Sequence, residues 1–509
     1  METKTAAIEM RNITKRFGPV LANDKVWLNI YRGEILALLG ENGSGKTTLM
    51  NMLSGIYFPD EGEIKIDGKE VVIRSPKDAF DNGIGMIHQH FKLVDVLTAA
   101  ENIVLGLPGK LDLKAASAKI REICDKYGFS VDPAQKIYDM SVSQKQTVEI
   151  VKVLYRGADI LILDEPTAVL TPQETDKLFA VLRNMRNDGK AIVIITHKMH
   201  EVEALSDRVA ILRHGQFIGD MLTAHTNAQE MTNMMVGHAV SLNIERPDPV
   251  DPKPRIEVKG LTVRSVDGIV KLDDVSFTAN SGEILGIAGI SGCGQKELLE
   301  AIAGLQTVES GSISYIEDDG SREELIGKDP LSIAELGVSL SFVPEDRLGM
   351  GLVGNMNLAD NMMLRSFRRG KSIFTDRRSP RALAESVVQE LSVSTPSVDT
   401  PVRRLSGGNV QTVLVGREIA SAPTVLLTAY AVRGLDIHSS YTIYDLINRQ
   451  KKAGVAVIFV GEDLDVLLEL CDRILVLCGG KVSGIVSGRG AEKREVGMMM
   501  TKLGGQSHE

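Results

Sequence analysis

The sequence predicts an α/β protein made of two homologous halves, each with a parallel-rich sheet at its core and an inserted helical subdomain. Three observations predict this fold class: an internal repeat, short apolar runs of strand length, and a proline-rich segment between the two copies. The chain has 509 residues, of which 43% are hydrophobic and 25% are charged. That composition is ordinary for globular protein, and the length allows several domains.

The internal repeat divides the chain into two copies. The segment Gly33–Leu36 recurs as Gly282–Leu285, and Asp207–Val209 recurs as the similar Asp472–Ile474. The second pair is further apart than the first, so the second copy has gained residues inside the domain. We therefore predict a first domain at residues 1–237 and a second domain at residues 256–509.

A proline-rich segment at residues 238–255 joins the two copies. It contains Pro247, Pro249, Pro252 and Pro254. Because proline fixes φ and has no N–H group, this density excludes helix and disfavours sheet. We expect an extended linker.

The first half contains short apolar runs that indicate buried strands. Ile35–Leu39 leads into a glycine-rich turn and then a helical pattern, and similar runs follow at residues 160–163, 191–195 and 209–212. Continuous apolar runs are typical of parallel strands that are covered on both faces. A polar, helix-rich stretch at residues 97–156 interrupts them and predicts the inserted helical subdomain.

The turn after the first of these strands has the pattern GxxxxGK[ST]. It consists of Gly40, Glu41, Asn42, Gly43, Ser44, Gly45, Lys46 and Thr47, and Thr48 follows. Glycines let backbone N–H groups converge on phosphate oxygens at the start of a helix. We expect the loop to bind ATP, with Lys46 reaching the β- and γ-phosphates and Thr47 ligating Mg²⁺. A tight turn without a ligand is the alternative, but the flanking strand and helix favour the phosphate loop.

Two acidic residues, Asp164 and Glu165, follow the apolar run at residues 160–163. They are expected at the C-terminal edge of the sheet, where α/β proteins bind their ligands. Asp164 is predicted to hold Mg²⁺, and Glu165 is predicted to act as the general base on the attacking water. Adjacent acids at a strand end also fit a solvated turn, but the phosphate loop upstream favours a site.

Three further residues could complete this site. Gln89 follows a strand-like run and could contact Mg²⁺ and the water, and His197 lies at another strand end and could contact the γ-phosphate. Phe17, upstream of the phosphate loop, could stack on adenine. Each of them alone is more typical of the core or the surface, and it is their combination that indicates a site.

The order of these motifs resembles that of ABC transporter ATPases over nearly the whole chain. Leu405–Asn409, with the sequence Leu-Ser-Gly-Gly-Asn, is similar to the signature motif of that family. The resemblance implies two tandem P-loop NTPase domains. It also implies these roles: Walker A for Gly40–Thr47, Walker B for Asp164 and Glu165, Q-loop for Gln89, switch histidine for His197, and a γ-phosphate cap for Ser406, Gly407 and Gly408.

Within that family, three segments look like the fused importers for simple sugars and nucleosides: Pro166–Thr171, Pro344–Arg347 and Gly461–Leu464. Gly268–Val270 and Tyr155–Asp159 favour the nucleoside branch. An ATPase for simple sugar import is the first alternative. A soluble ABC ATPase that acts on ribosomes or DNA is the second, and the short proline-rich linker argues against it.

The charge balance and the hydropathy limit the partners. Lys and Arg number 58 against 67 for Asp and Glu, and the net charge of −9 argues against a chain that wraps nucleic acid. No apolar stretch approaches the roughly 18–20 residues of a spanning helix. The resemblance implies two transmembrane permease subunits, an extracellular substrate-binding protein, and a peripheral position on the cytoplasmic face of the cell membrane.

The resemblance also implies that the halves pack head to tail, so that each ATP lies between the Walker motifs of one half and the signature of the other. The first Walker set and the second signature are complete. The other combination has lost its chemical groups, with these replacements: Gln295 for lysine, Lys296 for Ser/Thr, Ala429 and Tyr430 for the two acids, Glu345 for glutamine, Glu462 for histidine, and Met140–Gln144 for the signature. One residue along a helix rotates a side chain by about 100°, so we expect Lys296 to point away from the phosphates. We therefore predict one hydrolytic and one degenerate site.

Overall fold

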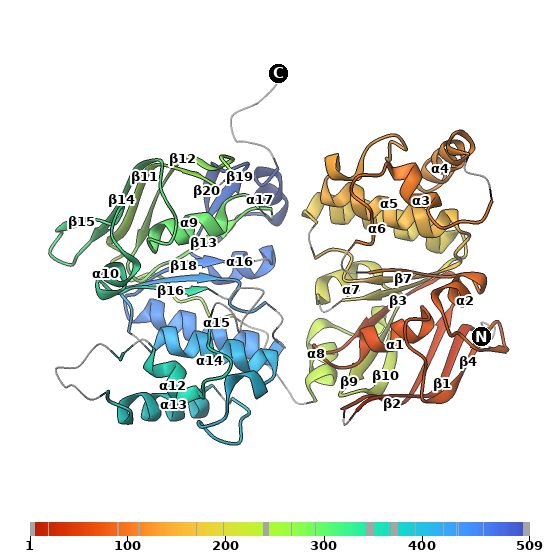
Figure 1. Ribbon diagram of the computed structural model, residues 1–509, viewed down its shortest axis with the longest axis horizontal. Coiled ribbons are helices and arrows are strands. Elements are labelled where there is room, and N and C mark those ends of the chain that lie inside the picture. Colours follow the sequence, from red (N-terminus) through yellow and green to blue (C-terminus); the bar gives the residue numbers. More distant parts are fainter. Residues whose placement is uncertain are drawn as a thin grey trace. The chain divides into compact units, whose positions relative to one another are not determined.

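The structure is a computed structural model. It describes residues 6–18, 20–88, 91–109, 112–168, 170–196, 198–237, 244–265, 267–290, 292–342, 351–364, 366–367, 375–391, 393–420, 422–433, 435, 437–461 and 463–501. The chain divides into two compact units, Met1–Ser241 and Leu242–Glu509. Figure 1 draws the first unit in red to yellow and the second in green to blue.

The first unit is built on a six-stranded sheet with the order β10-β9-β3-β8-β7-β6. The strands β9, β3, β8, β7 and β6 run parallel, and β10 pairs antiparallel with β9. Their bounds are β3 Glu34–Leu39, β6 Ile84–Ile87, β7 Ile160–Asp164, β8 Ala191–Ile195, β9 Arg208–Arg213 and β10 Gln216–Leu222. All residues of β3, β6, β7 and β8 are buried, which explains why they are apolar almost throughout.

Helices cover both faces of this sheet, with α6 on one side and α1 on the other (Figure 1). The helices outside the helical subdomain are α1 Lys46–Leu53, α2 Pro76–Asp81, α6 Pro172–Asn187, α7 Met199–Leu205 and α8 Ala228–Val236. On the α1 side a second, antiparallel sheet with the order β2-β1-β4-β5 closes the core. Its strands are β1 Ala6–Phe17, β2 Val20–Tyr31, β4 Glu61–Ile66 and β5 Lys69–Val71. Leu36 and Leu38 of β3 pack with Met50 of α1 and Ile8 of β1 in one apolar cluster.

The predicted helical subdomain is present in the first unit. It contains α3 Ala99–Val104, α4 Leu113–Tyr127 and α5 Val142–Tyr155. The three helices have their own apolar core, in which Ile103, Ile120 and Val148 are buried together. In the chain, these helices lie between β6 and β7, two strands of the central sheet. The subdomain is therefore an insertion into the α/β core.

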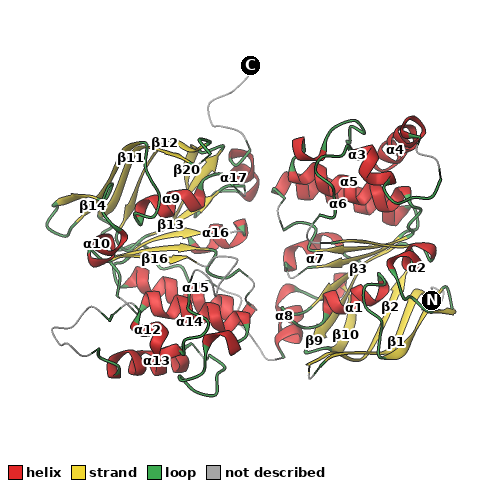
Figure 2. Ribbon diagram, viewed as in Figure 1, coloured by secondary structure: helices red, strands yellow, loops and turns green. Residues whose placement is uncertain are grey.

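The second unit repeats this architecture, with sheets in the orders β16-β17-β18-β13-β19-β20 and β12-β11-β14-β15. Its strands are β11 Pro254–Arg264, β12 Val270–Asn280, β13 Ile284–Ala288, β14 Ser310–Ile316, β15 Arg322–Glu324, β16 Val338–Phe342, β17 Val425–Ala429, β18 Ala456–Val460, β19 Arg473–Cys478 and β20 Lys481–Ser487. Its helices are α9 Gln295–Ile302, α10 Pro330–Glu335, α12 Leu358–Met363, α13 Arg378–Glu390, α14 Gly407–Ile419, α15 Ile437–Lys452, α16 Leu464–Leu470 and α17 Lys493–Met499. Figure 2 shows the same alternation of sheets and helices in each unit, which confirms the α/β repeat.

Residues 244–253, part of the proline-rich segment, contain no helix or strand and pack on the second unit. Arg246 Nη1 donates to the carbonyl oxygens of Leu468 (2.8 Å) and Cys471 (2.6 Å) at the end of α16. Asn448 Nδ2 of α15 donates to the Glu245 carbonyl oxygen at 2.6 Å. This part of the segment is therefore fixed to one unit rather than suspended as a free tether.

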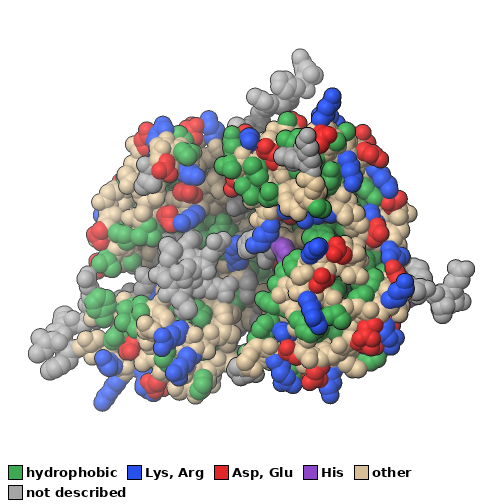
Figure 3. Space-filling view, turned by 45° about the vertical axis from the view of Figure 1, so that its right-hand side comes forward, with side chains coloured by type: hydrophobic (Ala, Val, Ile, Leu, Met, Phe, Trp, Pro, Cys, Tyr) green, Lys and Arg blue, Asp and Glu red, His purple; other side chains and the backbone are tan. Residues whose placement is uncertain are grey.

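The surface is mixed in charge. On the face that Figure 3 draws, Lys and Arg side chains are interspersed with Asp and Glu side chains among the described residues. Of the helices in the described part of the chain, none is long and apolar enough to cross a bilayer.

Candidate nucleotide-binding site

The loop between β3 and α1 has a conformation that requires glycine at defined points. Gly43 has φ 83° and Gly45 has φ 95°, both in the left-handed region. A Cβ on Gly45 would also lie 2.3 Å from the carbonyl oxygen of Ala22 and 2.7 Å from Asn23 Nδ2. The close approach of β2 therefore fixes the path of the loop just before α1 begins.

Lys46, the first residue of α1, turns back over this loop. Its Nζ donates to the carbonyl oxygens of Gly40 (2.7 Å) and Glu41 (3.0 Å), and the residue is only 8% exposed. Burial lowers the pKa of Lys46, while the carboxylates of Glu165, Asp164 and Glu41 act in the opposite direction. A buried cation at a helix N-terminus is suited to an anionic ligand such as phosphate.

Ser44 in the same loop supports a ligand that brings hydrogen-bond acceptors. The residue is 3% exposed, and its Oγ is buried without a hydrogen-bond partner among the described residues. Leaving a buried hydroxyl unpaired costs free energy, and phosphate oxygens would satisfy it. The loop therefore fits a nucleotide phosphate.

Asp164 ends β7 beside the start of α1, and Thr47 Oγ1 donates to its Oδ2 at 3.2 Å. Burial raises the pKa of Asp164, and Glu165 raises it further, whereas the hydrogen bond from Thr47 and the charge of Lys46 lower it. A hydroxyl and a carboxylate are oxygen ligands of the type that Mg²⁺ uses when phosphates and waters complete its shell. These two residues therefore fit a nucleotide-bound magnesium ion.

Glu165 follows in a strained turn with φ 46°, and its backbone N–H donates to the Ile195 carbonyl oxygen at 2.9 Å. Tyr430, the residue at the same place after β17, has φ 55° and donates to Val460 at the same distance. Because both units contain this turn, its strain belongs to the fold and is not specific to the acidic side chain.

Phe17 lies at the end of β1 and is 41% exposed. Its ring meets that of Tyr57 edge to face, with the ring centroids 5.1 Å apart, and Lys15 Nζ lies 5.5 Å from the Phe17 centroid. Tyr57 is not among the residues predicted from the sequence, although the apolar run Ile56–Phe58 after α1 is a signal for it. An exposed aromatic pair at the end of β1 and shortly after α1 is a suitable surface for a nucleobase.

Two predicted site residues, Gln89 and His197, lie outside the described residues, as do Glu345 and Glu462 at the matching positions of the second half. The other predicted residues of the first half all belong to the β3–α1 loop, the start of α1, the end of β7 with the turn after it, or the end of β1.

In the second unit, Ser406 caps α14. The Asn409 N–H donates to Ser406 Oγ at 3.4 Å, and Asn409 Nδ2 donates to the same oxygen at 3.0 Å. A Cβ added to Gly408 would meet only Leu435 Cδ2, at an ordinary 3.5 Å. The packing of the second unit itself therefore does not require glycine at position 408. Ser406 and Gly407 are exposed at this helix N-terminus.

Among the described residues of the second unit, no ammonium group is directed into the counterpart of the phosphate loop. Gln295 occupies the position of Lys46, is buried, and donates from Nε2 to the Ile290 carbonyl oxygen at 3.2 Å. The side chain of Lys296 is 48% exposed, and its Nζ pairs with Glu300 one turn along α9 at 3.6 Å. Ala429 ends β17 where Asp164 ends β7.

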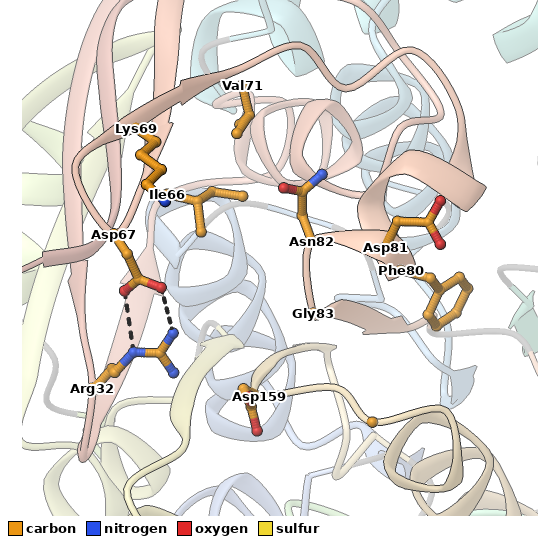
Figure 4. Close-up of a pocket in the computed structure, with 11 residues that line it drawn as sticks. Arg32, Ile66, Asp67, Lys69, Val71, Phe80, Asp81, Asn82, Gly83 and Asp159 are labelled. Atoms are coloured by element: carbon orange, nitrogen blue, oxygen red, sulfur yellow. Dashed lines mark hydrogen bonds and ion pairs between the residues drawn. The ribbon is translucent and has the colours of Figure 1, made fainter.

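A cavity of about 470 Å³ lies elsewhere in the first unit, between the β4–β5 hairpin and the start of β6 (Figure 4). On one side of it, Arg32 donates to the neighbouring Asp67, from Nε at 3.2 Å and from Nη2 at 2.8 Å (Figure 4). Gly83 and Asp159, which also line it, precede β6 and β7. The cavity therefore lies at the N-terminal ends of the strands, whereas Asp164 lies at the C-terminal end of β7, so the cavity is not part of the candidate nucleotide site.

Proteins of one family are similar to this chain over most of its length. A family model described as ABC transporter matches residues 23–168 and 272–428. The chain is 42% identical over 509 residues to the Nucleoside import ATP-binding protein NupA of Lactococcus lactis subsp. cremoris (strain MG1363), with 99% of each chain covered. It is 39% identical over 536 residues to the Glucose import ATP-binding protein TsgD13 of Haloferax volcanii, with 98% of this chain and 96% of the relative covered.

Among solved structures, the complex of archaeal ribosomal stalk protein aP1 and archaeal ribosome recycling factor aABCE1 matches with a TM-score of 0.60. The match covers 91% of this chain and 87% of that chain at 16% identity, so it shows the shared fold alone. Because the family model matches both units and the relatives are aligned end to end, the chain belongs to the ABC transporter family, as an ATPase subunit with two ABC domains in one polypeptide.

Proposed function

We propose that this chain powers an ABC importer and that its first unit carries the only Walker motifs able to hydrolyse ATP. The observation that carries this proposal is the contrast between matching positions. The first unit has a buried Lys46 and a Thr47–Asp164 hydrogen bond, whereas the second has Gln295 and Ala429 there. Without the ammonium and the carboxylate, γ-phosphate charge and its metal have no protein partners at those positions.

In this proposal Lys46 binds the β- and γ-phosphates, Thr47 and Asp164 hold Mg²⁺, and Glu165 orients and deprotonates the attacking water. Magnesium, when bound, neutralises charge on the phosphates. Gln89 contacts the metal and the water, and His197 contacts the γ-phosphate. Phe17 with Tyr57 stacks on adenine. We also propose that Ser406, Gly407 and Gly408 complete this site from the second unit, since glycine at position 408 has no packing reason within its own unit.

The test compares matched substitutions. Lys46→Ala should abolish ATP turnover by the full-length chain in complex with its permeases, whereas Gln295→Ala, at the matching position, should leave most of it. Vanadate trapping of nucleotide should label the first phosphate loop and spare the second. Equal labelling of the two loops, or equal loss of turnover in the two variants, would falsify the assignment.

We propose nucleosides as the cargo, with simple sugars as the second candidate. The identity to a nucleoside import relative is 42% and that to a glucose import relative is 39%, and Gly268–Val270 and Tyr155–Asp159 favour the former. The partners would be two permease subunits and an extracellular substrate-binding protein, and the chain would lie on the cytoplasmic face of the membrane. A ligand screen on the cognate binding protein tests the cargo: binding of ribose or glucose but no nucleoside would overturn it.

We propose domains at residues 1–237 and 256–509 joined by residues 238–255, of which Pro254 and Arg255 already belong to β11. The contacts of Arg246 and Asn448 support a linker whose second part belongs to the surface of the second domain. Limited proteolysis of the full-length chain tests this division: we expect the first cut before residue 244, and a first cut between residues 244 and 255 would contradict it.

A further inference from the structure

Glu201 is a buried carboxylate close to the proposed hydrolytic residues. It lies in the first turn of α7, and its side chain is 3% exposed. Thr167 Oγ1 donates to Glu201 Oε1, and Thr196 Oγ1 donates to Oε2 at 3.1 Å. Lys198 Nζ lies 3.2 Å from Oε1 and supplies the opposite charge. Both carboxylate oxygens are thus paired.

These partners come from two segments that flank the proposed chemistry. Thr167 lies two residues after Glu165, and Thr196 lies directly after β8 and directly before His197. The strands β7 and β8 are neighbours, with Asp164 opposite Ile195. Glu201 therefore joins the turn that carries Glu165 to the segment that leads into His197. The Lys198 N–H, which donates to Thr196 Oγ1 at 3.1 Å, extends this junction.

A buried carboxylate is expensive, because removing it from water costs several kcal/mol that its partners must offset. Apolar residues of similar volume often give equal or better stability. A network of this kind therefore calls for a reason beyond folding.

The second unit provides the comparison. At the positions that match Thr167, Thr196 and Glu201 it has Val432, Gly461 and Val466. Both valines pack against the apolar core of that unit. The strands β17 and β18 and the helix α16 form there with the same lengths as β7, β8 and α7. The second unit thus folds with apolar side chains at the positions of Thr167 and Glu201.

A second contact to the same turn behaves differently. Gln146 Nε2 of α5 donates to the Pro166 carbonyl oxygen, and Gln411 Nε2 of α14 donates to the carbonyl oxygens of Ala431 and Tyr430. This glutamine is present in both units, which is what a fold requirement predicts. The Glu201 network is present only in the unit with the complete Walker motifs.

We propose that Glu201 is a positioning residue for ATP hydrolysis. Through Thr167 and Thr196 it holds the Glu165 turn in register with the segment that precedes His197, so that the groups acting on the water and the γ-phosphate keep their relative places. Its effect is on turnover and not on nucleotide binding. This inference rests on the proposed function of the first unit.

The test places the valines of the second unit, Val432 and Val466, at the matching positions of the first unit. The double variant Thr167→Val/Glu201→Val should fold, because the second unit folds with those residues. We expect unchanged ATP affinity and thermal midpoint and a kcat lowered about 10- to 100-fold, the range for a misplaced catalytic group. Glu201→Gln, which keeps the shape and one acceptor oxygen, should recover part of the rate. Val466→Ala is the control in the second unit and should leave kcat unchanged.

The measurements are kcat and KM for ATP, equilibrium ATP binding, and thermal unfolding of the full-length chain with its permeases. A kcat within twofold of the unmodified chain in the double variant would overturn the role of Glu201. So would a loss of turnover that matches a loss of ATP binding or of the folded state. Lys46→Ala, measured in parallel, separates the two proposals: if it leaves turnover intact, the proposed function itself fails.

Discussion

The substitution Gly45→Ala tests whether β2 fixes the shape of the phosphate loop. Gly45 has φ 95°, and an added Cβ would lie 2.3 Å from the carbonyl oxygen of Ala22. That oxygen belongs to the backbone of β2, so it cannot rotate away as a side chain could. The loop must therefore shift, and α1, which begins at the next residue, must shift with it or strain.

The structure gives the size of the effect in two parts. A left-handed φ costs alanine about 1–2 kcal/mol, and forcing an extra methyl into a packed position costs about 1–3 kcal/mol more. Gly43 is the matched control, since it has φ 83° and nothing within 4 Å of an added Cβ. The difference between the two variants isolates the contact, at about 1–3 kcal/mol or roughly 5- to 150-fold in an equilibrium constant.

Equilibrium binding of ATP to the full-length chain with Mg²⁺ measures this difference. We expect the loop of the Gly45→Ala variant to relax away from the shape that binds phosphate. Because ATP binding must then restore the strained shape, Gly45→Ala should bind ATP roughly 5- to 150-fold more weakly than Gly43→Ala. Thermal unfolding recorded alongside checks that the first unit remains folded. Equal affinities of the two variants would refute the idea that β2 holds the loop.

Three further predictions concern burial. Lys46→Met should raise the thermal midpoint of the nucleotide-free chain. Burial lowers the pKa of Lys46 below its usual 10.5, so the charged ammonium destabilises the folded unit at neutral pH, and this destabilisation is lost only as the pH rises from the lowered pKa to 10.5. An unchanged or lower midpoint would contradict this prediction. Arg246→Ala should lower the free energy of unfolding of the second unit by about 1–3 kcal/mol, measured with denaturant. The control Lys253→Ala, which removes an exposed ion pair with Asp251, should lower it by less than about 0.5 kcal/mol. Equal losses would refute the role of the Arg246 contacts. A thiol reagent should modify Cys478 before Cys471, as detected by mass spectrometry, because Cys471 is fully buried and burial strongly raises its pKa. Labelling of Cys471 in the folded chain would be inconsistent with that burial.

The central sheet could be predicted closely from the sequence because its strands are buried on both faces. The apolar runs at residues 35–39, 160–163 and 191–195 became β3, β7 and β8 with bounds that agree within one residue. The antiparallel sheet was not predicted, although Val26, Leu28 and Ile30 alternate with exposed residues along β2. That period-two signal is weaker because half of each strand faces solvent.

Contacts between distant residues could not be predicted from local patterns. Arg246 binds carbonyl oxygens more than 200 positions away, and neither end has a motif that announces the other. The same holds for Tyr57 beside Phe17 and for Glu201 beside Thr167, where each residue alone is unremarkable. Motif spacing predicted the loop and the acids, whereas their supporting contacts depend on how strands and helices pack.

The repeat also separates what the fold needs from what the chemistry needs. Glu165 and Tyr430 share a positive φ and the same backbone hydrogen bond to the next strand. Gln146 and Gln411 hold that turn in both units. Since the second unit keeps these features without the acids, they belong to the scaffold, and a substitution at Gln146 should affect stability before it affects turnover.

Gly408 leads to the complementary conclusion. It is present in the unit that has no ammonium or carboxylate at its own Walker positions, although the packing of that unit would accept a Cβ at position 408 next to Leu435. A residue that is kept without a local packing reason is best explained by a partner outside its own unit. Gly408 therefore supports the proposal that the signature acts on the ATP that Lys46 is proposed to bind. We expect Gly408→Ala to lower turnover while leaving the thermal midpoint of the chain unchanged. A fall in both, measured on the same preparation, would instead assign Gly408 to the stability of α14.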